Sequence, residues 1–209
     1  MKILIIGIPR TGSTSLWSNI INLGYSGLNE PYRRYNHNYL KHPYPLDILK
    51  NEKIVVKHLI HDIPRKKYIG NMSDIEVCKE MSEQFDKTII LDRRNSQEML
   101  ESYIGLYYNL DNNMDIHSSW EFSNIPKEYV NQFILDNKHK LIYDFKTKIQ
   151  TLSTLLSIPI TYYEDLYGED RELSLNIIKS WKLDIDEERL NDTLNPLNRY
   201  RLFQKKSII

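Results

Sequence analysis

Short apolar runs recur along the chain, and several of them are followed by a turn and then by apolar residues at helical spacing. Residues 3–6 form the first unbroken run, which is typical of a strand covered on both faces of a parallel sheet. Similar runs predict strands near residues 2–7, 53–57, 88–92 and 159–163. We therefore expect a three-layer α/β sandwich with a short parallel sheet between helices.

The first predicted strand leads directly into a loop bounded by Gly7 and Gly12. Apolar residues at helical steps follow over residues 16–23, and Gly24 stands where a helix commonly ends. A strand, a tight loop and a helix start direct backbone N–H groups and the positive end of the helix dipole at one point. This order predicts a binding site for a multiply charged anion.

The spacing from Gly7 to Gly12 matches the start of a Walker A loop, in which a lysine that reaches the β- and γ-phosphates comes next. This chain has Ser13 at that position, and the cation of the loop is Arg10 instead. The loop therefore lacks the lysine that is the main phosphate-binding cation of a nucleotide kinase.

Residues 9–17, Pro-Arg-Thr-Gly-Ser-Thr-Ser-Leu-Trp, resemble the 5′-phosphosulfate loop of the sulfotransferases. Members of that family use 3′-phosphoadenosine 5′-phosphosulfate (PAPS) as sulfuryl donor, and the loop holds its 5′-phosphate and sulfate. The resemblance implies a fold like that of the P-loop nucleotide-binding proteins. It also implies that the loop residues bind PAPS, namely Arg10, Thr11, Gly12, Ser13, Thr14 and Ser15, with Arg10 serving catalysis as well.

A second motif follows the strand at residues 88–92. Asn95 and Glu98 have the spacing of a helix N-cap and its capping-box partner. Arg94 and Ser102, eight residues apart across that helix start, resemble the 3′-phosphate motif of the sulfotransferases. A guanidinium binds a phosphate through two hydrogen bonds, and a hydroxyl takes a remaining oxygen. The spacing favours Arg94 over Arg93 for this role.

Two segments between these motifs offer catalytic groups. Gly27, Glu30 and Pro31 resemble the Gly-x-x-Glu-Pro segment of the glycolipid, carbohydrate and tyrosylprotein branches, in which the glutamate acts as general base. Lys57 and His58 resemble the Lys-Thr-His-Leu segment of the small-molecule branch, in which the histidine is the base, although the threonine is missing here. Because an acceptor hydroxyl must lose its proton during sulfuryl transfer, we assign Glu30 as the first candidate base, His58 as the alternative, and Lys57 to stabilisation of the sulfate or acceptor.

Two other functions stay open. Residues 88–92 also resemble a Walker B strand, in which Asp92 would hold Mg²⁺ in a P-loop kinase or related NTPase. The C-terminal loop that contacts the sulfuryl donor in the sulfotransferases is not recognisable, although Arg199 or Arg201 could serve there. A non-catalytic binder of PAPS or a nucleotide is therefore the third interpretation.

Composition narrows the function classes. The 209 residues are expected to form one domain, residues 1–209, and 28 basic residues against 28 acidic ones argue against a nucleic-acid binder. The single Cys78 has no ligand-type spacing around it, so we expect neither a metal site nor a disulfide framework. No apolar run is long enough to span a bilayer, and we expect a cytoplasmic protein.

The acceptor is expected to be a hydroxyl or amine of a small molecule, carbohydrate, lipid or peptide. Aromatic residues that could line an acceptor cleft are Tyr32, Tyr35, Tyr39, Tyr103, Tyr107 and Trp120. Pro126 is expected to begin a long helical stretch, which we interpret as core packing and as a candidate acceptor lid. Glu164 and Asp165, at the end of the last strand, are interpreted as structural partners. The oligomeric state is left open.

Overall fold

A parallel sheet forms the centre of the computed structural model, which describes residues 1–32, 53–61, 70–114 and 124–184. Within these ranges the sheet has five strands, all parallel, in the order β2-β3-β1-β4-β5. The strands are β1 (Lys2–Gly7), β2 (Ser26–Asn29), β3 (Ile54–Leu59), β4 (Lys87–Asp92) and β5 (Ile160–Tyr162). The predicted α/β class is confirmed.

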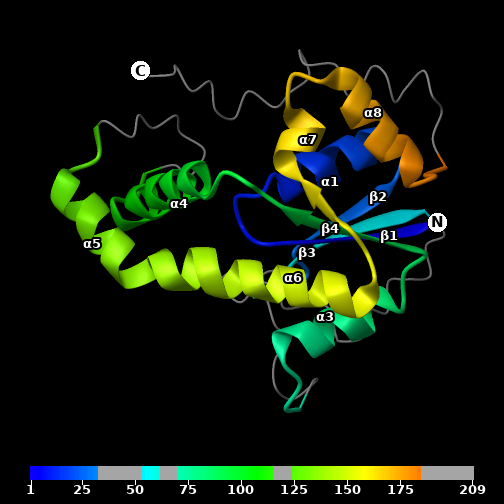
Figure 1. Ribbon diagram of the computed structural model, residues 1–209, viewed down its shortest axis with the longest axis horizontal. Coiled ribbons are helices and arrows are strands. Elements are labelled where there is room, and N and C mark those ends of the chain that lie inside the picture. Colours follow the sequence, from blue (N-terminus) through cyan, green and yellow to red (C-terminus); the bar gives the residue numbers. More distant parts are fainter. Residues whose placement is uncertain (33–52, 62–69, 115–123, 185–209) are drawn as a thin grey trace.

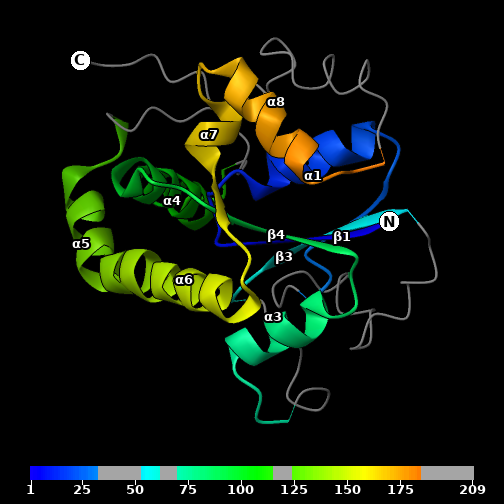
Figure 2. The same ribbon diagram turned by 45° about the vertical axis from the view of Figure 1, so that its right-hand side comes forward.

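Helices cover both faces of the sheet. Figures 1 and 2 show one face covered by α1 (Ser13–Asn22), α7 (Tyr163–Tyr167) and α8 (Arg171–Ser180). The opposite face is covered by α3 (Asp74–Ser82) and α6 (Phe145–Leu156). This arrangement is consistent with the predicted three layers. None of the described helices is long and apolar enough to cross a membrane.

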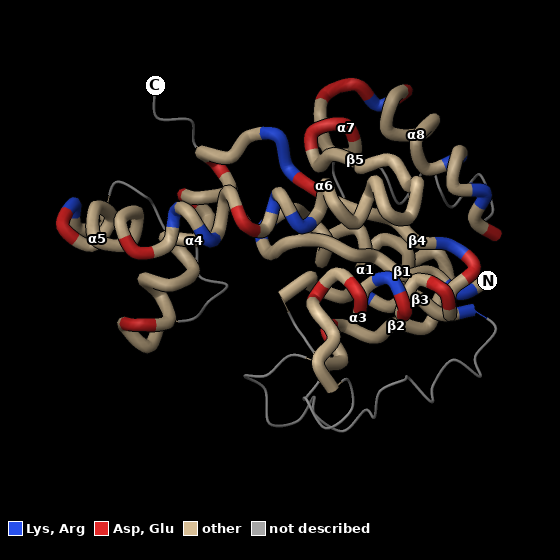
Figure 3. Tube along the Cα trace, turned by 60° about the horizontal axis from the view of Figure 1, so that its bottom comes forward, with Lys and Arg blue, Asp and Glu red and all other residues tan. Residues whose placement is uncertain are grey.

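Two further helices lie beyond the carboxyl ends of the strands. They are α4 (Ser96–Asp111) and α5 (Lys127–Lys138). Ligands of open α/β sheets bind outside this edge, so α4 and α5 stand next to the expected site. Figure 3 shows basic and acidic positions interspersed along the described trace, with acidic positions marking α7.

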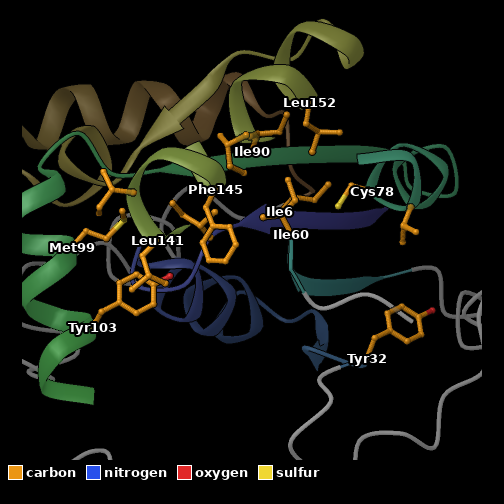
Figure 4. Packing of buried hydrophobic residues seen from close by; sticks show 14 of the residues in the cluster. Ile6, Tyr32, Ile60, Cys78, Ile90, Met99, Tyr103, Leu141, Phe145 and Leu152 are labelled. Carbon is orange, nitrogen blue, oxygen red and sulfur yellow. The ribbon is translucent and has the colours of Figure 1, made fainter. Parts of the chain in front are cut away.

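The alternation of side chains along the strands divides the core in two. On β1, Ile3 and Ile5 pack with Leu16 and Ile20 of α1. Leu4 and Ile6 belong to the other cluster, which contains Phe145, Ile149 and Leu152 of α6 and is shown in part in Figure 4. Because both faces are covered, neither face of β1 can be polar, which explains its unbroken apolar run.

The edge strand β2 is an element that the apolar pattern did not predict. Its four residues, Ser26–Asn29, are exposed or half-buried, and they pair with Ile54–Lys57 of β3. A sheet edge that is partly open to solvent needs no apolar run, so its sequence carries little strand signal.

The helical stretch that was predicted from Pro126 is present but is not a uniform α-helix. Between α5 and α6 the chain forms a π-helix, η3 (His139–Asp144), and Figures 1 and 2 show α5 and α6 running in different directions. A wider helical turn is a common cause of such a change of direction.

The N-cap at Asn95 is confirmed, because its side chain accepts a hydrogen bond from the Glu98 N–H at 3.0 Å. The second half of the predicted capping box is wrong. The Glu98 carboxylate binds Arg93, and the Asn95 N–H donates to Glu164 at 2.9 Å. A tertiary contact thus replaces the expected local one.

Candidate functional site

The loop between β1 and α1 is a compact turn at the carboxyl end of the sheet. Arg10 (φ 69°) and Gly12 (φ 78°) both have left-handed backbone conformations, which are uncommon for a residue other than glycine. The buried Thr11 hydroxyl donates to the carbonyl of Ile8 at 2.7 Å. Thr11 therefore closes the loop with its side chain, and its expected role toward a ligand falls to its backbone.

The start of α1 differs from those of α3, α4 and α8. In the described residues no side chain caps α1, and its first turn contains no acidic residue. The other three helices are capped by Ser73, Asn95 and Asp170 and carry acidic residues in the first turn. The first turn of α1 therefore supplies no capping or acidic side chain to offset the positive end of its dipole, a condition that favours anion binding.

Arg10 connects this loop to α4. Its Nε donates to the Ser102 Oγ at 2.7 Å, across 92 residues of sequence. Burial lowers the pKa of Arg10; nearby Tyr103 opposes this shift and Arg93 adds to it. The structure thus brings together one residue from each of the two motifs that the sequence singled out.

Glu30 and Lys57 form a buried ion pair at the start of α1. The Lys57 ammonium contacts the Glu30 carboxylate and also donates to the Thr14 hydroxyl at 2.6 Å. Only 4% of the Lys57 side chain and 6% of the Glu30 side chain are exposed. Lys57 therefore brings a cation from β3 to the helix whose loop lacks the Walker A lysine.

His58 lies on the opposite face of β3 from Lys57, since successive strand residues alternate. It is 1% exposed, and the edge of its ring meets Tyr32 at a centroid distance of 6.1 Å. Burial, with a smaller contribution from His61, lowers the pKa of His58 to about 3. His58 is thus neutral near pH 7 and is separated by the sheet from the Glu30–Lys57 pair.

The burial of His58 predicts acid sensitivity. Its pKa is about 3 in the folded chain and 6.5 in the unfolded chain, so the unfolded state binds the additional proton as the pH falls below 6.5. Stability is fully present above pH 6.5, and we expect about 2 kcal/mol to be lost between pH 8 and pH 5. Urea unfolding of the wild type and of His58→Phe across this range should show a shallower pH slope for the variant. The same pH slope in both proteins would contradict this expectation. His139→Phe, at an exposed histidine, is the control and should keep the pH slope of the wild type.

Arg94 is held outside the loop by acidic residues of α7. Its guanidinium binds both carboxylate oxygens of Asp165, one of them at 2.7 Å, and lies 4.1 Å from the Tyr162 ring centroid. Its side chain is 51% exposed, and no hydrogen bond joins it to Ser102 in the described structure. Glu164 accepts the backbone N–H of Arg94 at 3.0 Å. Glu164 and Asp165 thus fasten the start of α4, the structural role expected of them.

Arg93, which the motif spacing disfavoured, is the more buried arginine of the pair. Its side chain is 15% exposed, pairs with Glu98 and lies 4.7 Å from the Tyr163 ring centroid. A Cβ placed on Gly12 would lie only 2.3 Å from that Tyr163 ring. Tyr163 therefore contacts both the loop, at Gly12, and Arg93. The sequence signal for Arg93 was only its position beside Arg94.

Asp92, the residue of the kinase interpretation, lies on the α6 side of the sheet. Its carboxylate is 3.8 Å from the Lys146 ammonium and accepts the Arg93 N–H at 2.7 Å. Burial raises the pKa of Asp92. Among the described residues, no group of three or more His, Cys, Asp or Glu side chains could hold a metal ion.

Five of the residues named from sequence lie outside the part of the chain that the structure describes: Tyr35, Tyr39, Trp120, Arg199 and Arg201.

Comparisons with models of protein families, with curated proteins and with solved structures found no match for this chain.

Proposed function

We propose that the protein is a sulfotransferase that moves the sulfuryl group of PAPS to a hydroxyl group of an acceptor. The observation that carries the proposal is the hydrogen bond between Arg10 and Ser102. The two segments that resemble the sulfuryl-donor motifs are far apart in sequence, and this bond holds them together at one helix start. A chance likeness of two short segments would not require them to meet.

The leaving phosphate is assigned to the loop. As the bond from sulfur to the phosphate oxygen breaks, negative charge grows on that oxygen, next to the uncapped start of α1 and Arg10. Fixed hydrogen-bond donors aimed at growing charge contribute about 3–4 kcal/mol each to catalysis. Arg94 is assigned to the 3′-phosphate, because it is half exposed and can exchange Asp165 for a phosphate.

The acceptor proton is assigned to Glu30. The acceptor oxygen forms its bond to sulfur as the phosphate leaves, and its proton passes to the Glu30 carboxylate. Glu30 is preferred over His58 because it shares a hydrogen-bonded cluster with Lys57 and Thr14 at the start of α1. His58 lies across the sheet, and its lowered pKa makes it a weak proton acceptor. Lys57 would hold Glu30 in place and offset charge on the sulfate.

Titration calorimetry tests the assignment of the sulfuryl donor. We expect the wild type to bind 3′-phosphoadenosine 5′-phosphate (PAP), the desulfated product, at least about tenfold more tightly than 5′-AMP, because a charged hydrogen bond contributes about 1.5–3 kcal/mol. Arg94→Ala should remove this difference, and Ser102→Ala should weaken binding of PAP. Ser82→Ala, which removes a hydroxyl bonded within α3, is the matched control. A preference for ATP with Mg²⁺ over PAP would reject the proposal.

Turnover distinguishes an enzyme from a binder. With PAPS and a panel of hydroxyl acceptors, release of PAP should require an acceptor and should be lost in Glu30→Gln. Binding of PAP should survive that substitution, since the sulfuryl donor is assigned to the other residues. Tight binding of PAP without acceptor-dependent turnover would instead support the non-catalytic binder.

A further inference from the structure

Two buried hydrogen-bond donors near Arg10 have no acceptor among the described residues. They are the Nε of Arg93 and the hydroxyl of Tyr103. A buried donor without an acceptor destabilises a protein, and native structures contain few of them. The Trp17 Nε1 and the Tyr167 hydroxyl also have no acceptor within the described ranges, so what distinguishes this pair is its position near Arg10, where a bound oxyanion would supply both acceptors.

Arg93 stands next to the loop because its strand does. Leu91 of β4 pairs with Gly7 of β1, at the last position before the loop. Beyond this pair, Arg93 stacks on Tyr163, whose ring packs against Gly12. The Arg93 charge is close enough to help lower the pKa of Arg10. Two guanidinium groups are thus held near one loop despite their repulsion, which an anion between them would relieve.

Tyr103 approaches the same loop from α4. It follows Ser102, the hydrogen-bond partner of Arg10, and is 1% exposed. Figure 4 shows its side chain leaving α4 toward Leu141, at the edge of the core cluster. Burial raises the pKa of Tyr103 well above its ordinary value, although Arg10 lowers it somewhat. The hydroxyl therefore keeps its proton near pH 7 and can act as a donor.

We propose that Arg93 and Tyr103 donate hydrogen bonds, beside Arg10, to an oxyanion bound at the loop. The sequence indicated other roles for both: the motif spacing disfavoured Arg93, and Tyr103 was a candidate for lining an acceptor cleft. For the identity of the ligand this inference rests on the proposed function, in which the oxyanion is the 5′-phosphate end of PAPS. Arg93 then binds the 5′-phosphate end of PAPS, and Arg94 binds its 3′-phosphate.

Calorimetry with PAP and with 5′-AMP separates the two arginines, because only PAP carries the 3′-phosphate. Arg93→Gln should weaken binding of both ligands by about 10- to 100-fold and leave the ratio of their dissociation constants unchanged. Arg94→Gln should reduce this ratio toward one. Tyr103→Phe should weaken both ligands about three- to tenfold. Loss of the ratio in Arg93→Gln, or unchanged binding of both ligands, would overturn the assignment.

Glu98→Gln is the matched control for Arg93. It breaks the same ion pair but keeps the guanidinium, so both ligands should bind within about twofold of wild type, as expected for loss of a partly exposed pair. A loss as large as that of Arg93→Gln would mean that Arg93 acts only through the ion pair, and would overturn the inference. Tyr103→Phe should also raise the melting temperature without ligand, since it removes a buried hydroxyl without an acceptor.

A third ligand keeps this test separate from that of the proposed function. If the wild type binds neither PAP nor 5′-AMP, the sulfotransferase proposal fails, and inorganic pyrophosphate at constant ionic strength becomes the probe. A rise in melting temperature of the wild type that is absent in Arg93→Gln would support the oxyanion site. No rise in the wild type, or an equal rise in both proteins, would overturn it.

Discussion

Lys57→Met is expected to lower the free energy of unfolding by about 3–5 kcal/mol, because it removes the ammonium group from the buried Glu30 carboxylate. Methionine resembles lysine in length, so the packing around β3 changes little and the effect reports mainly the loss of charge. Urea unfolding followed by circular dichroism measures it. The double variant Glu30→Gln/Lys57→Met should recover roughly half of the loss or more, since neither charge then remains buried.

Lys79→Met is the control for this prediction. Lys79 pairs with Glu83 on the surface of α3, and both side chains are about half exposed. The same substitution should cost only about 0.3–0.5 kcal/mol there, because solvent screens an exposed pair. Equal losses in Lys57→Met and Lys79→Met would show that the Glu30–Lys57 pair is not sheltered from solvent, and would weaken the case for Glu30 as a base held by Lys57.

Gly12→Ala is expected to destabilise the protein by about 2–5 kcal/mol. A left-handed conformation costs a residue with a Cβ about 1–2 kcal/mol, and overpacking adds about 1–3 kcal/mol. The new Cβ would lie 2.3 Å from the Tyr163 ring. That ring cannot move away freely, because it packs against Tyr167 at a centroid distance of 4.9 Å and carries Arg93 above it.

Gly24→Ala separates the two causes. Gly24 has a similar backbone angle (φ 93°), but a Cβ there would meet nothing within 4 Å. Its replacement should therefore cost only the conformational part, about 1–2 kcal/mol. In thermal unfolding, Gly12→Ala should have a lower melting temperature than Gly24→Ala. When Tyr163→Leu is added to both variants, this difference in melting temperature should become smaller. If the two alanine variants have the same melting temperature, the contact of Tyr163 with the loop is not tight.

The parts of the fold that the sequence predicted are those with a local cause. The apolar run of β1 follows from burial on both faces, and the positions of Gly7 and Gly12 follow from the loop that they bound. The hydrogen bond between Arg10 and Ser102 is the exception, because the two residues lie 92 positions apart; the sequence linked them only through the resemblance of both segments to one family.

The other features depend on neighbours that no local pattern reveals. β2 is a strand because β3 lies beside it, and its own residues show no apolar run. Lys57 and His58 stand together in sequence, yet the alternation of β3 sends them to opposite faces. The motif spacing chose Arg94, whereas the acidic side chains of α7 hold that residue away from the loop and leave Arg93 beside it.

The central place of β1 in the sheet has a consequence for the newly made chain. β1 ends at Gly7, but its two neighbours begin at Ile54 and Lys87. A ribosome adds about 5–20 residues per second. Several seconds therefore pass between the synthesis of β1 and that of β4, its second neighbour in the sheet. During that interval its backbone and side chains are open to chaperones and to other nascent chains. The loop between β1 and α1, which is bonded to α4 through Arg10 and Ser102, can take its final shape only afterwards.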